Sequence, residues 1–485
     1  MPNGFSNHPP SLKIFFATEM WERYGFYVVQ TLLVLYLVMH FEWGDHRTYP
    51  LIGAFTALTY LSPVVGGWIA DRLLGQKLSI LLGASVLFFS YLAMSYWTNE
   101  IGLFYSLSGI AVGTGLLKPN ISSLLGNEYH DDSPRRERGF TIFYLGITTG
   151  IILGTTLPSY IQSVKGWPAA FFSAAIGMVF AILIFSFGIK HYAVKDYSSY
   201  THSFKKITFA CALLTALYFG SFYILRHSAL AEILFTCIAV FSFVYLFLTI
   251  LQEKAQQARQ TMVIGLLCLI SMMFWSFYFQ MFSSIMVFLK RVTQPSLFGF
   301  PFPPPYYVAV QSIGMIILGL FLGRNPKKTN IYKRTIQAGN KFVLAMVCMT
   351  IAYLLLIIAC NLDKGFGLLT PLYFIPSYLM ISLAELLLSP IGLAAMTLLS
   401  SHKKVSTMMG IFFVSLGIGG FLSGRIATIA AIPKEKLDLL TIAELKTEYA
   451  ISFTHMLYLL LGATFISILL NFIIRYLMSQ KTKQP

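Results

Sequence analysis

The feature that most constrains this chain is the recurrence, from one end to the other, of strongly apolar segments of about 20 residues. A segment of that length can cross the hydrocarbon core of a bilayer as an α-helix. Only 11% of the 485 residues are charged, whereas soluble domains carry about 25%. The pattern therefore predicts a multi-span membrane protein. It excludes an ordinary soluble enzyme, a disordered chain and a nucleic-acid-binding domain.

The sequence divides into fourteen such segments, and the Lys and Arg residues between them set the expected orientation. With the N-terminus placed in the cytoplasm, 23 of the 35 Lys and Arg residues fall on the cytoplasmic side, nine on the other side and three inside spans. Cytoplasmic loops are normally enriched in these residues. We therefore expect both termini to be cytoplasmic. The same rule accounts for the net charge of +16 without a nucleic-acid partner.

Two apolar helices expected at 205–251 differ from the rest, because basic and polar stretches flank them. Without this pair, six spans precede and six follow, which is the arrangement of the major facilitator superfamily of transporters. We predict an all-α integral membrane protein with fourteen transmembrane helices. Residues 1–190 would form the N-terminal six-helix bundle, 191–260 a linker with two extra transmembrane helices, and 261–485 the C-terminal six-helix bundle.

Charged residues inside spans are the first functional candidates, because a charge at the bilayer centre costs about 2.5–3.5 kcal/mol on the insertion scale. Glu19, Glu22 and Arg23 have i, i+3 and i+4 spacing and so share one helix face, which Tyr27 and Gln30 continue. Two carboxylates beside one guanidinium can hold one proton more or one fewer. The alternative is a structural ion pair that fixes helix packing.

Further candidates lie in other spans. Lys118 follows two glycines that allow close helix approach, and it could pair with a carboxylate of the first span. Glu385 is a carboxylate in the second half that could equally be a buried, hydrogen-bonded group. Asp71 and Arg72, at the cytoplasmic end of the second span, are interpreted as a gating and packing loop. We find no sequence motif of a catalytic or metal site, and we expect neither an enzyme nor a bound cofactor.

Several segments resemble, in order, the proton-dependent oligopeptide transporter family of the major facilitator superfamily. The segment EMWERYGFY at 19–27 resembles the family's first signature. Six further segments match later family blocks: YLSPVVGGWIADRLLGQKLSILLG at 60–83, GTGLLKPNISSLLG at 113–126, FYLGITTG at 143–150, GWPAAFFSAAIGM at 166–178, ELLLSPIGL at 385–393 and MMGIFFVSLGIGGFLSG at 408–424. Bacterial members also have fourteen spans, so a bacterial inner membrane is the expected location.

The resemblance implies import of di- and tripeptides with protons as the coupling ion, and it implies a role for each candidate. Glu19, Glu22, Arg23 and Lys118 would couple to protons, and Glu385 would meet the peptide amino group. The expected substrate-binding residues are Arg23, Tyr27, Gln30, Tyr60, Lys118, Thr148, Trp275, Gln280, Gly314 and Glu385. The expected partners are a small-molecule substrate and the lipid bilayer; the sequence does not indicate an oligomeric state.

The chain departs from the family pattern at positions expected to bind the peptide. Thr148 and Gly314 replace asparagines, Gln30 replaces a basic residue, and Phe279 and Gln280 stand where members usually carry a Glu. These departures keep open a second cargo on the same fold: a modified amino acid, a peptide-like metabolite or an organic anion, imported or exported. A substrate sensor without transport also stays open.

Overall fold

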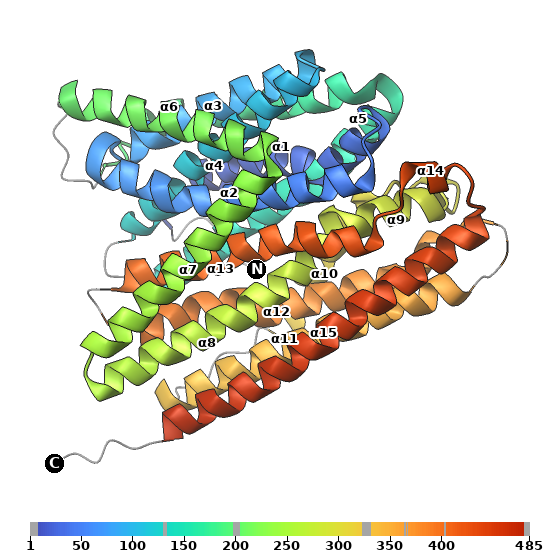
Figure 1. Cartoon of the computed structure of the whole chain (residues 1–485). Helices are drawn as coiled ribbons and strands as arrows, with labels where there is room; N and C mark the ends of the chain where they lie inside the picture. The colour runs from blue at the N-terminus through green and yellow to red at the C-terminus, as the bar shows by residue number, and fades with distance from the viewer. Residues whose placement is uncertain are drawn as a thin grey trace. The chain divides into compact units, whose positions relative to one another are not determined.

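The structure is a computed structural model that describes residues 8–129, 133–196, 204–322, 331–362, 365, 367–401 and 404–479. The described residues are mostly helical, and their one β-sheet is a hairpin of two strands with two residues each (Figure 1). The chain forms two compact units. Unit 1 comprises Met1–Tyr36 and Leu58–Leu230, and unit 2 comprises Leu37–Ala57 and Ala231–Pro485.

Unit 1 contains the first helices of the chain and the first helix of the inserted pair. They are α1 (Leu12–Met39), the second part of α2 (Asp45–Ile69), the π-helical turn η1 (Ala70–Leu74), α3 (Gln76–Tyr96), α4 (Glu100–Asn127), α5 (Ser133–His191) and α6 (Phe204–Arg226). Helix α5 is two helices joined at a kink, where Gly166 has a φ of 82°. Only glycine adopts such a backbone conformation readily, so this position ends one span and starts the next.

A stripe of glycines fixes α1 against α5. Added Cβ atoms at Gly146, Gly150 and Gly154 would lie 2.8, 2.3 and 2.5 Å from backbone oxygens of α1. Any larger side chain would therefore push the two helices apart. Small residues at i and i+4 allow this kind of close contact between membrane helices, where lipid supplies no hydrophobic drive for association. The stripe explains how α1 can hold charged side chains at a fixed depth in unit 1.

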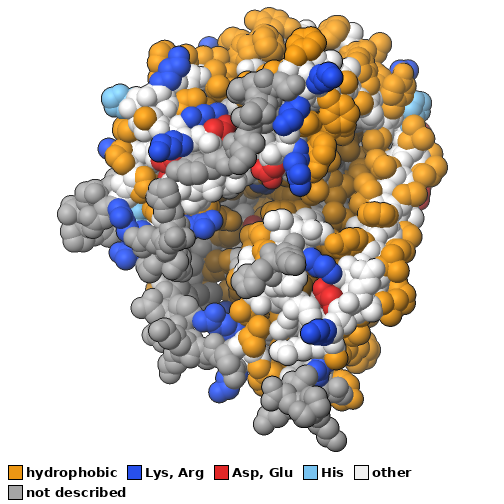
Figure 2. All heavy atoms as spheres, turned by 90° about the vertical axis from the view of Figure 1, so that its left-hand side faces the viewer, with side chains coloured by type: hydrophobic (Ala, Val, Ile, Leu, Met, Phe, Trp, Pro, Cys, Tyr) orange, Lys and Arg blue, Asp and Glu red, His pale blue; other side chains and the backbone are white. Residues whose placement is uncertain are grey.

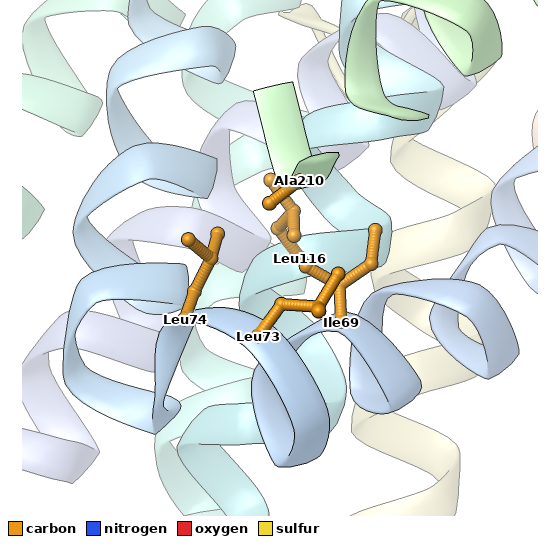
Figure 3. Packing of buried hydrophobic residues seen from close by; sticks show 5 residues of the cluster. All are labelled: Ile69, Leu73, Leu74, Leu116 and Ala210. Carbon is orange, nitrogen blue, oxygen red and sulfur yellow. The ribbon is translucent and has the colours of Figure 1, made fainter. Parts of the chain in front are cut away.

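The inserted helix α6 packs on the end of the second span. Ala210 of α6 is fully buried against Ile69, Leu73 and Leu74 and against Leu116 of α4 (Figure 3). The Tyr218 hydroxyl donates a hydrogen bond of 3.1 Å to a backbone carbonyl of α4. The first inserted helix is thus attached to unit 1 by both apolar packing and a hydrogen bond.

Unit 2 contains the second inserted helix and the remaining spans. The elements are α7 (Ser228–Gln252), α8 (Ala255–Tyr278), η2 (Phe279–Phe282), α9 (Ser284–Val292), β1 (Ser296–Leu297), β2 (Phe300–Pro301), α10 (Pro305–Leu322), α11 (Ile331–Leu362), η3 (Pro371–Tyr373), α12 (Ile375–Leu399), α13 (Val405–Ala427), η4 (Thr428–Ala430), α14 (Lys434–Leu437) and α15 (Ile442–Ser479). Strands β1 and β2 pair antiparallel. Helix α11 packs against both α12 and α15 (Figure 1).

The second inserted helix is held by unit 2. Glu232 of α7 accepts a hydrogen bond of 2.5 Å from Arg425 of α13, and both side chains are substantially exposed. The rings of Phe235 and Phe421, on the same two helices, lie 4.9 Å apart between centroids. The inserted pair therefore divides between the two units near the start of α7, after Leu230.

The prediction of fourteen apolar helices is confirmed within the described residues. Eleven helical stretches are long and apolar enough to cross a membrane, and one of them is the kinked α5, which supplies two spans. Two further helices complete the set: α1, which carries the charged cluster, and the shorter α10. Hydrophobic side chains cover much of the surface in Figure 2, as expected for contact with lipid.

Candidate functional site

The charged cluster on α1 is built around Arg23. Glu22 binds the guanidinium through both oxygens, with 2.5 Å from Nε to Oε2 and 2.6 Å from Nη2 to Oε1. Glu22 is fully buried and Arg23 is 4% exposed. A bidentate contact of this kind fixes the orientation of both groups. Glu22 is therefore the main partner of the cation.

Glu19 occupies a different position in the cluster. Its Oε1 lies 3.5 Å from Nε of Arg23, while its Oε2 is buried without a hydrogen-bond partner among the described residues. A buried carboxylate oxygen without a partner is unfavourable, and a bound proton relieves that penalty. Of the two acidic side chains, Glu19 is therefore the better placed to take up and release a proton.

The remaining residues of the α1 stripe surround this cluster. The guanidinium carbon of Arg23 lies 4.8 Å from the ring centre of Phe26. Tyr27 is half-buried, whereas Gln30 is 4% exposed and its Oε1 accepts no hydrogen bond within the described part of the chain. The hydroxyl of Tyr91 on α3 is likewise buried without a described partner. The side chains of Gln30 and Tyr91 therefore retain unused hydrogen-bonding capacity in unit 1.

Lys118 and Tyr60 lie together in unit 1. The ammonium nitrogen is 5.0 Å from the centre of the Tyr60 ring, which is a cation–π contact. Within the described residues Lys118 forms no ion pair shorter than 4.0 Å, so the pairing with a first-span carboxylate is not made in this structure. The role predicted for Lys118 in substrate binding stays a prediction.

The other predicted residues of unit 1 have simpler surroundings. The hydroxyl of Thr148 donates a hydrogen bond of 3.0 Å to the backbone oxygen of Tyr144 on its own helix. Asp71 and Arg72 are exposed on the turn η1, which continues α2 as a helix rather than a loop. The gating role predicted for Asp71 and Arg72 stays a prediction.

Glu385 is the predicted acidic residue of unit 2, and two other helices bind it. Its Oε2 accepts two hydrogen bonds. One, of 2.8 Å, comes from the hydroxyl of Tyr278 on α8, and the other, of 2.7 Å, comes from Nε2 of Gln311 on α10. Both partners are almost completely buried, and Glu385 itself is partly accessible. Sequence reasoning did not find Tyr278 and Gln311, because no spacing rule connects residues on three different helices.

Gln280 lies in the short helix η2 and is fully buried. Its Nε2 donates hydrogen bonds to the backbone oxygen of Ser423, at 2.8 Å, and to the hydroxyl of the same residue, at 3.2 Å. Its Oε1 accepts a hydrogen bond of 2.6 Å from the hydroxyl of Ser284. Trp275 is 4% exposed and stacks on Phe279, with 5.4 Å between ring centroids. In this structure both side chains pack inside unit 2, and their substrate contacts stay a prediction.

Gly314 lies where α10 approaches α12. A Cβ atom added there would lie 2.6 Å from the hydroxyl of Ser382 and 2.9 Å from Leu379. A larger side chain at this position would therefore require the side chains of Ser382 and Leu379 to move. Having no side chain, Gly314 contributes space rather than a binding group at this position.

A second buried ion pair was not expected from the sequence. Arg291 at the end of α9 binds both oxygens of Asp45, with distances of 2.7 and 2.8 Å. It also donates a hydrogen bond of 2.7 Å to the hydroxyl of Tyr449. Asp45 is 1% exposed and also accepts a hydrogen bond of 3.1 Å from the backbone N–H of Ile432. The two charges are 246 positions apart in the chain, and only the fold shows that they are buried together.

Comparison with known proteins gives a consistent family assignment. A family model described as the POT family matches residues 77–446. The dipeptide and tripeptide permease A of Salmonella typhimurium is 30% identical over 440 residues, covering 89% of this chain and 86% of that protein. The permease of the same name from Escherichia coli strain K12 is 29% identical over the same length and coverage.

Solved structures agree with the sequence matches. The crystal structure of tetrameric PepTSo2 superposes with a TM-score of 0.83 at 26% identity, covering 96% of this chain and 99% of that one. A peptide transporter POT in complex with alafosfalin has a TM-score of 0.79 at 22% identity, a likeness that shows the fold alone. The architecture and the sequence therefore lead to the same family.

Proposed function

Because the chain belongs to the POT family, we propose that it is a proton-coupled secondary transporter of di- and tripeptides or peptide-like zwitterions. The observation that carries the proposal is the pair of unlike carboxylates on α1. Glu22 is committed to Arg23, whereas Glu19 has a buried oxygen without a described partner. That arrangement suits a group that gains and loses a proton while its neighbour holds the cation in place.

Proton uptake and peptide binding would be linked through Arg23. A proton on Glu19 removes one negative charge beside the guanidinium, so Arg23 then attracts the carboxylate of a substrate more strongly. Lys118, whose ammonium nitrogen lies 5.0 Å from the centre of the Tyr60 ring, adds a second positive charge in unit 1. Loss of the proton restores the competing carboxylate and favours release of the substrate.

Glu385 of unit 2 would recognise an ammonium group of the substrate. Glu385 carries a partly accessible carboxylate, and a charge-assisted hydrogen bond to an ammonium group is worth about 1.5–3 kcal/mol. The carboxylate of a zwitterionic substrate suits the cations Arg23 and Lys118 of unit 1, and its ammonium group suits Glu385 of unit 2. Transport would proceed by alternating access, in which the protein makes no covalent change to its cargo.

We place the protein in a bacterial inner membrane with both termini in the cytoplasm and with import as the direction. The excess of Lys and Arg on one side of the spans supports this orientation. Lys and Arg side chains also gather on the face that Figure 2 shows. Protons then enter down their gradient together with the peptide.

Counterflow in proteoliposomes tests the substrate class. Vesicles containing the purified protein are loaded with one unlabelled candidate substrate at a time. Uptake of labelled dialanine and of labelled phenylalanyl-alanine is then measured in parallel. Exchange should be supported by di- and tripeptides with a free amino group and a free carboxylate. If neither labelled dipeptide is taken up with any internal candidate, and a labelled N-acylated amino acid or another labelled organic anion does exchange, the cargo is not a peptide.

A further inference from the structure

Two residues outside the predicted site hold the side chain of Glu385. We infer that Tyr278 and Gln311 are positioning residues, which bind one oxygen of Glu385 so that the other oxygen is presented to the amino group of the substrate. This inference rests on the proposed function. It adds the groups that set selectivity for a free amine.

The geometry at Glu385 is asymmetric. Tyr278 and Gln311 both donate to Oε2, at 2.8 and 2.7 Å, while Oε1 accepts no hydrogen bond from the described residues. An ionised carboxylate accepts through both oxygens, so two donors on one oxygen leave the other available. Because the two donors come from α8 and α10, they fix the carboxylate from two directions.

The donors are themselves held in place. Tyr278 is 6% exposed, and its ring packs edge-on against Trp275 with 4.7 Å between centroids. Gln311 is 2% exposed, and its Oε1 accepts 3.4 Å from the hydroxyl of Ser312, which orients its Nε2 toward Glu385. Trp275 therefore contributes to the site indirectly, by packing against Tyr278.

The glycine at 314 makes the contact from α10 possible. Gly314 lies one turn after Gln311, and its missing side chain lets α12 approach α10 closely. At this crossing the hydroxyl of Ser382 donates 2.7 Å to the backbone oxygen of Gln311. The glycine at 314 and the use of Gln311 as a donor to Glu385 are thus parts of one arrangement.

The experiment compares free and blocked amines on the same purified protein. Binding of dialanine and phenylalanyl-alanine, and of their N-acetyl derivatives, is measured for wild type, Tyr278→Phe and Gln311→Leu. The ratio of the two affinities does not depend on how much of a variant is folded. A single net hydrogen bond corresponds to about a 2- to 12-fold change in affinity. Each variant should have an affinity for the free-amine ligands that is lower by that factor, and its affinity for the N-acetyl ligands should equal that of wild type.

Matched controls separate positioning from general loosening of unit 2. Tyr353→Phe removes a buried hydroxyl that donates 3.0 Å to the backbone oxygen of Phe277, and Gln257→Leu removes an amide that donates 3.0 Å to the backbone oxygen of Leu399. Neither residue contacts Glu385, so both controls should keep the wild-type ratio. Equal losses for free and blocked amines in Tyr278→Phe, or the same change of ratio in the controls, would overturn the inference.

A double-mutant cycle with Glu385→Gln gives the second criterion. If Tyr278 and Gln311 act through Glu385, their substitutions should leave the ratio unchanged once Glu385 is already neutral. Additive effects would refute a positioning role. If Glu385→Gln lowers the ratio of the two affinities while Tyr278→Phe and Gln311→Leu leave it unchanged, this inference alone is refuted. A wild type that binds none of the four ligands refutes both it and the proposed function.

Discussion

Replacement of Glu19 by glutamine is expected to uncouple transport without unfolding the protein. The change removes the carboxylate whose Oε2 is buried without a described partner, and it leaves the bidentate contact between Glu22 and Arg23 intact. Arg23 loses only the longer contact of 3.5 Å. We therefore expect Glu19→Gln to keep counterflow exchange and to lose proton-driven accumulation.

The size of the effect follows from the energy that one proton carries. Each elementary charge moved through 100 mV supplies about 2.3 kcal/mol, which corresponds to about a 50-fold concentration ratio of peptide across the membrane. Without a proton site on Glu19, this ratio should fall to about 1. Replacement of Glu22 should act differently, because it leaves Arg23 buried with its weaker partner and destabilises the fold by about 3–5 kcal/mol.

The assay is uptake of labelled dipeptide into proteoliposomes under an inward proton gradient and an internally negative potential. Counterflow without a gradient is measured on the same vesicles, and thermal unfolding in detergent on the same protein. Glu232→Gln serves as the control, because its ion pair with Arg425 is largely exposed. Accumulation by Glu19→Gln to the wild-type ratio would refute the assignment, as would the loss of exchange together with accumulation.

Three further predictions concern other groups. Lys118→Ala should lower peptide affinity about tenfold or more by removing a cation near Tyr60, with little recovery in Lys118→Arg because a planar guanidinium replaces a compact ammonium. Asp45→Asn should lower the free energy of unfolding by about 3–5 kcal/mol, because Arg291 is then buried without its counter-ion. Burial and the charges of Arg135 and Arg138 lower the pKa of His8 below its ordinary value of 6.5, so His8 should still be mostly neutral at pH 6.5 in the folded protein and should gain its proton only as the pH falls through the lowered pKa.

Each of these predictions has its own check. Competition binding measures the Lys118 variants, and wild-type affinity in Lys118→Ala would remove this residue from substrate binding. Thermal unfolding in detergent compares Asp45→Asn with Glu42→Gln, whose exposed pair with Lys434 should contribute little; equal midpoints would contradict the role of the buried pair. For His8, an NMR titration of the labelled imidazole should show a midpoint below 6.5, and a midpoint above 6.5 would contradict the argument.

The sequence predicts the helices well because the membrane imposes a simple rule on them. A span must be long and apolar, and its backbone must satisfy its own hydrogen bonds, so apolar length identifies it. Local spacing also brings Glu19 and Arg23 together, because they are four residues apart on one helix. The tightest contact of the cluster, between the adjacent residues Glu22 and Arg23, does not follow from helical spacing and depends on the side-chain conformations.

Contacts between helices could not be predicted from the chain alone. The hydroxyl of Tyr278 reaches a carboxylate 107 positions later, and Arg291 meets an aspartate 246 positions earlier. Such pairs depend on how closely helices approach, which is set by glycines such as Gly314. For the same reason the sequence could not show that Gln280 is enclosed by hydrogen bonds within unit 2.

Proton movement linked to peptide binding is the central claim, and it can be measured directly. A pH-sensitive dye is enclosed in proteoliposomes with the purified protein, and the internal pH is recorded when phenylalanyl-alanine is added outside at zero membrane potential. The account predicts internal acidification in wild type, none with the N-acetyl derivative, and none in Glu19→Gln even though that variant still exchanges peptide. Peptide uptake by wild type without acidification, or acidification of the same size in Glu19→Gln, would contradict it.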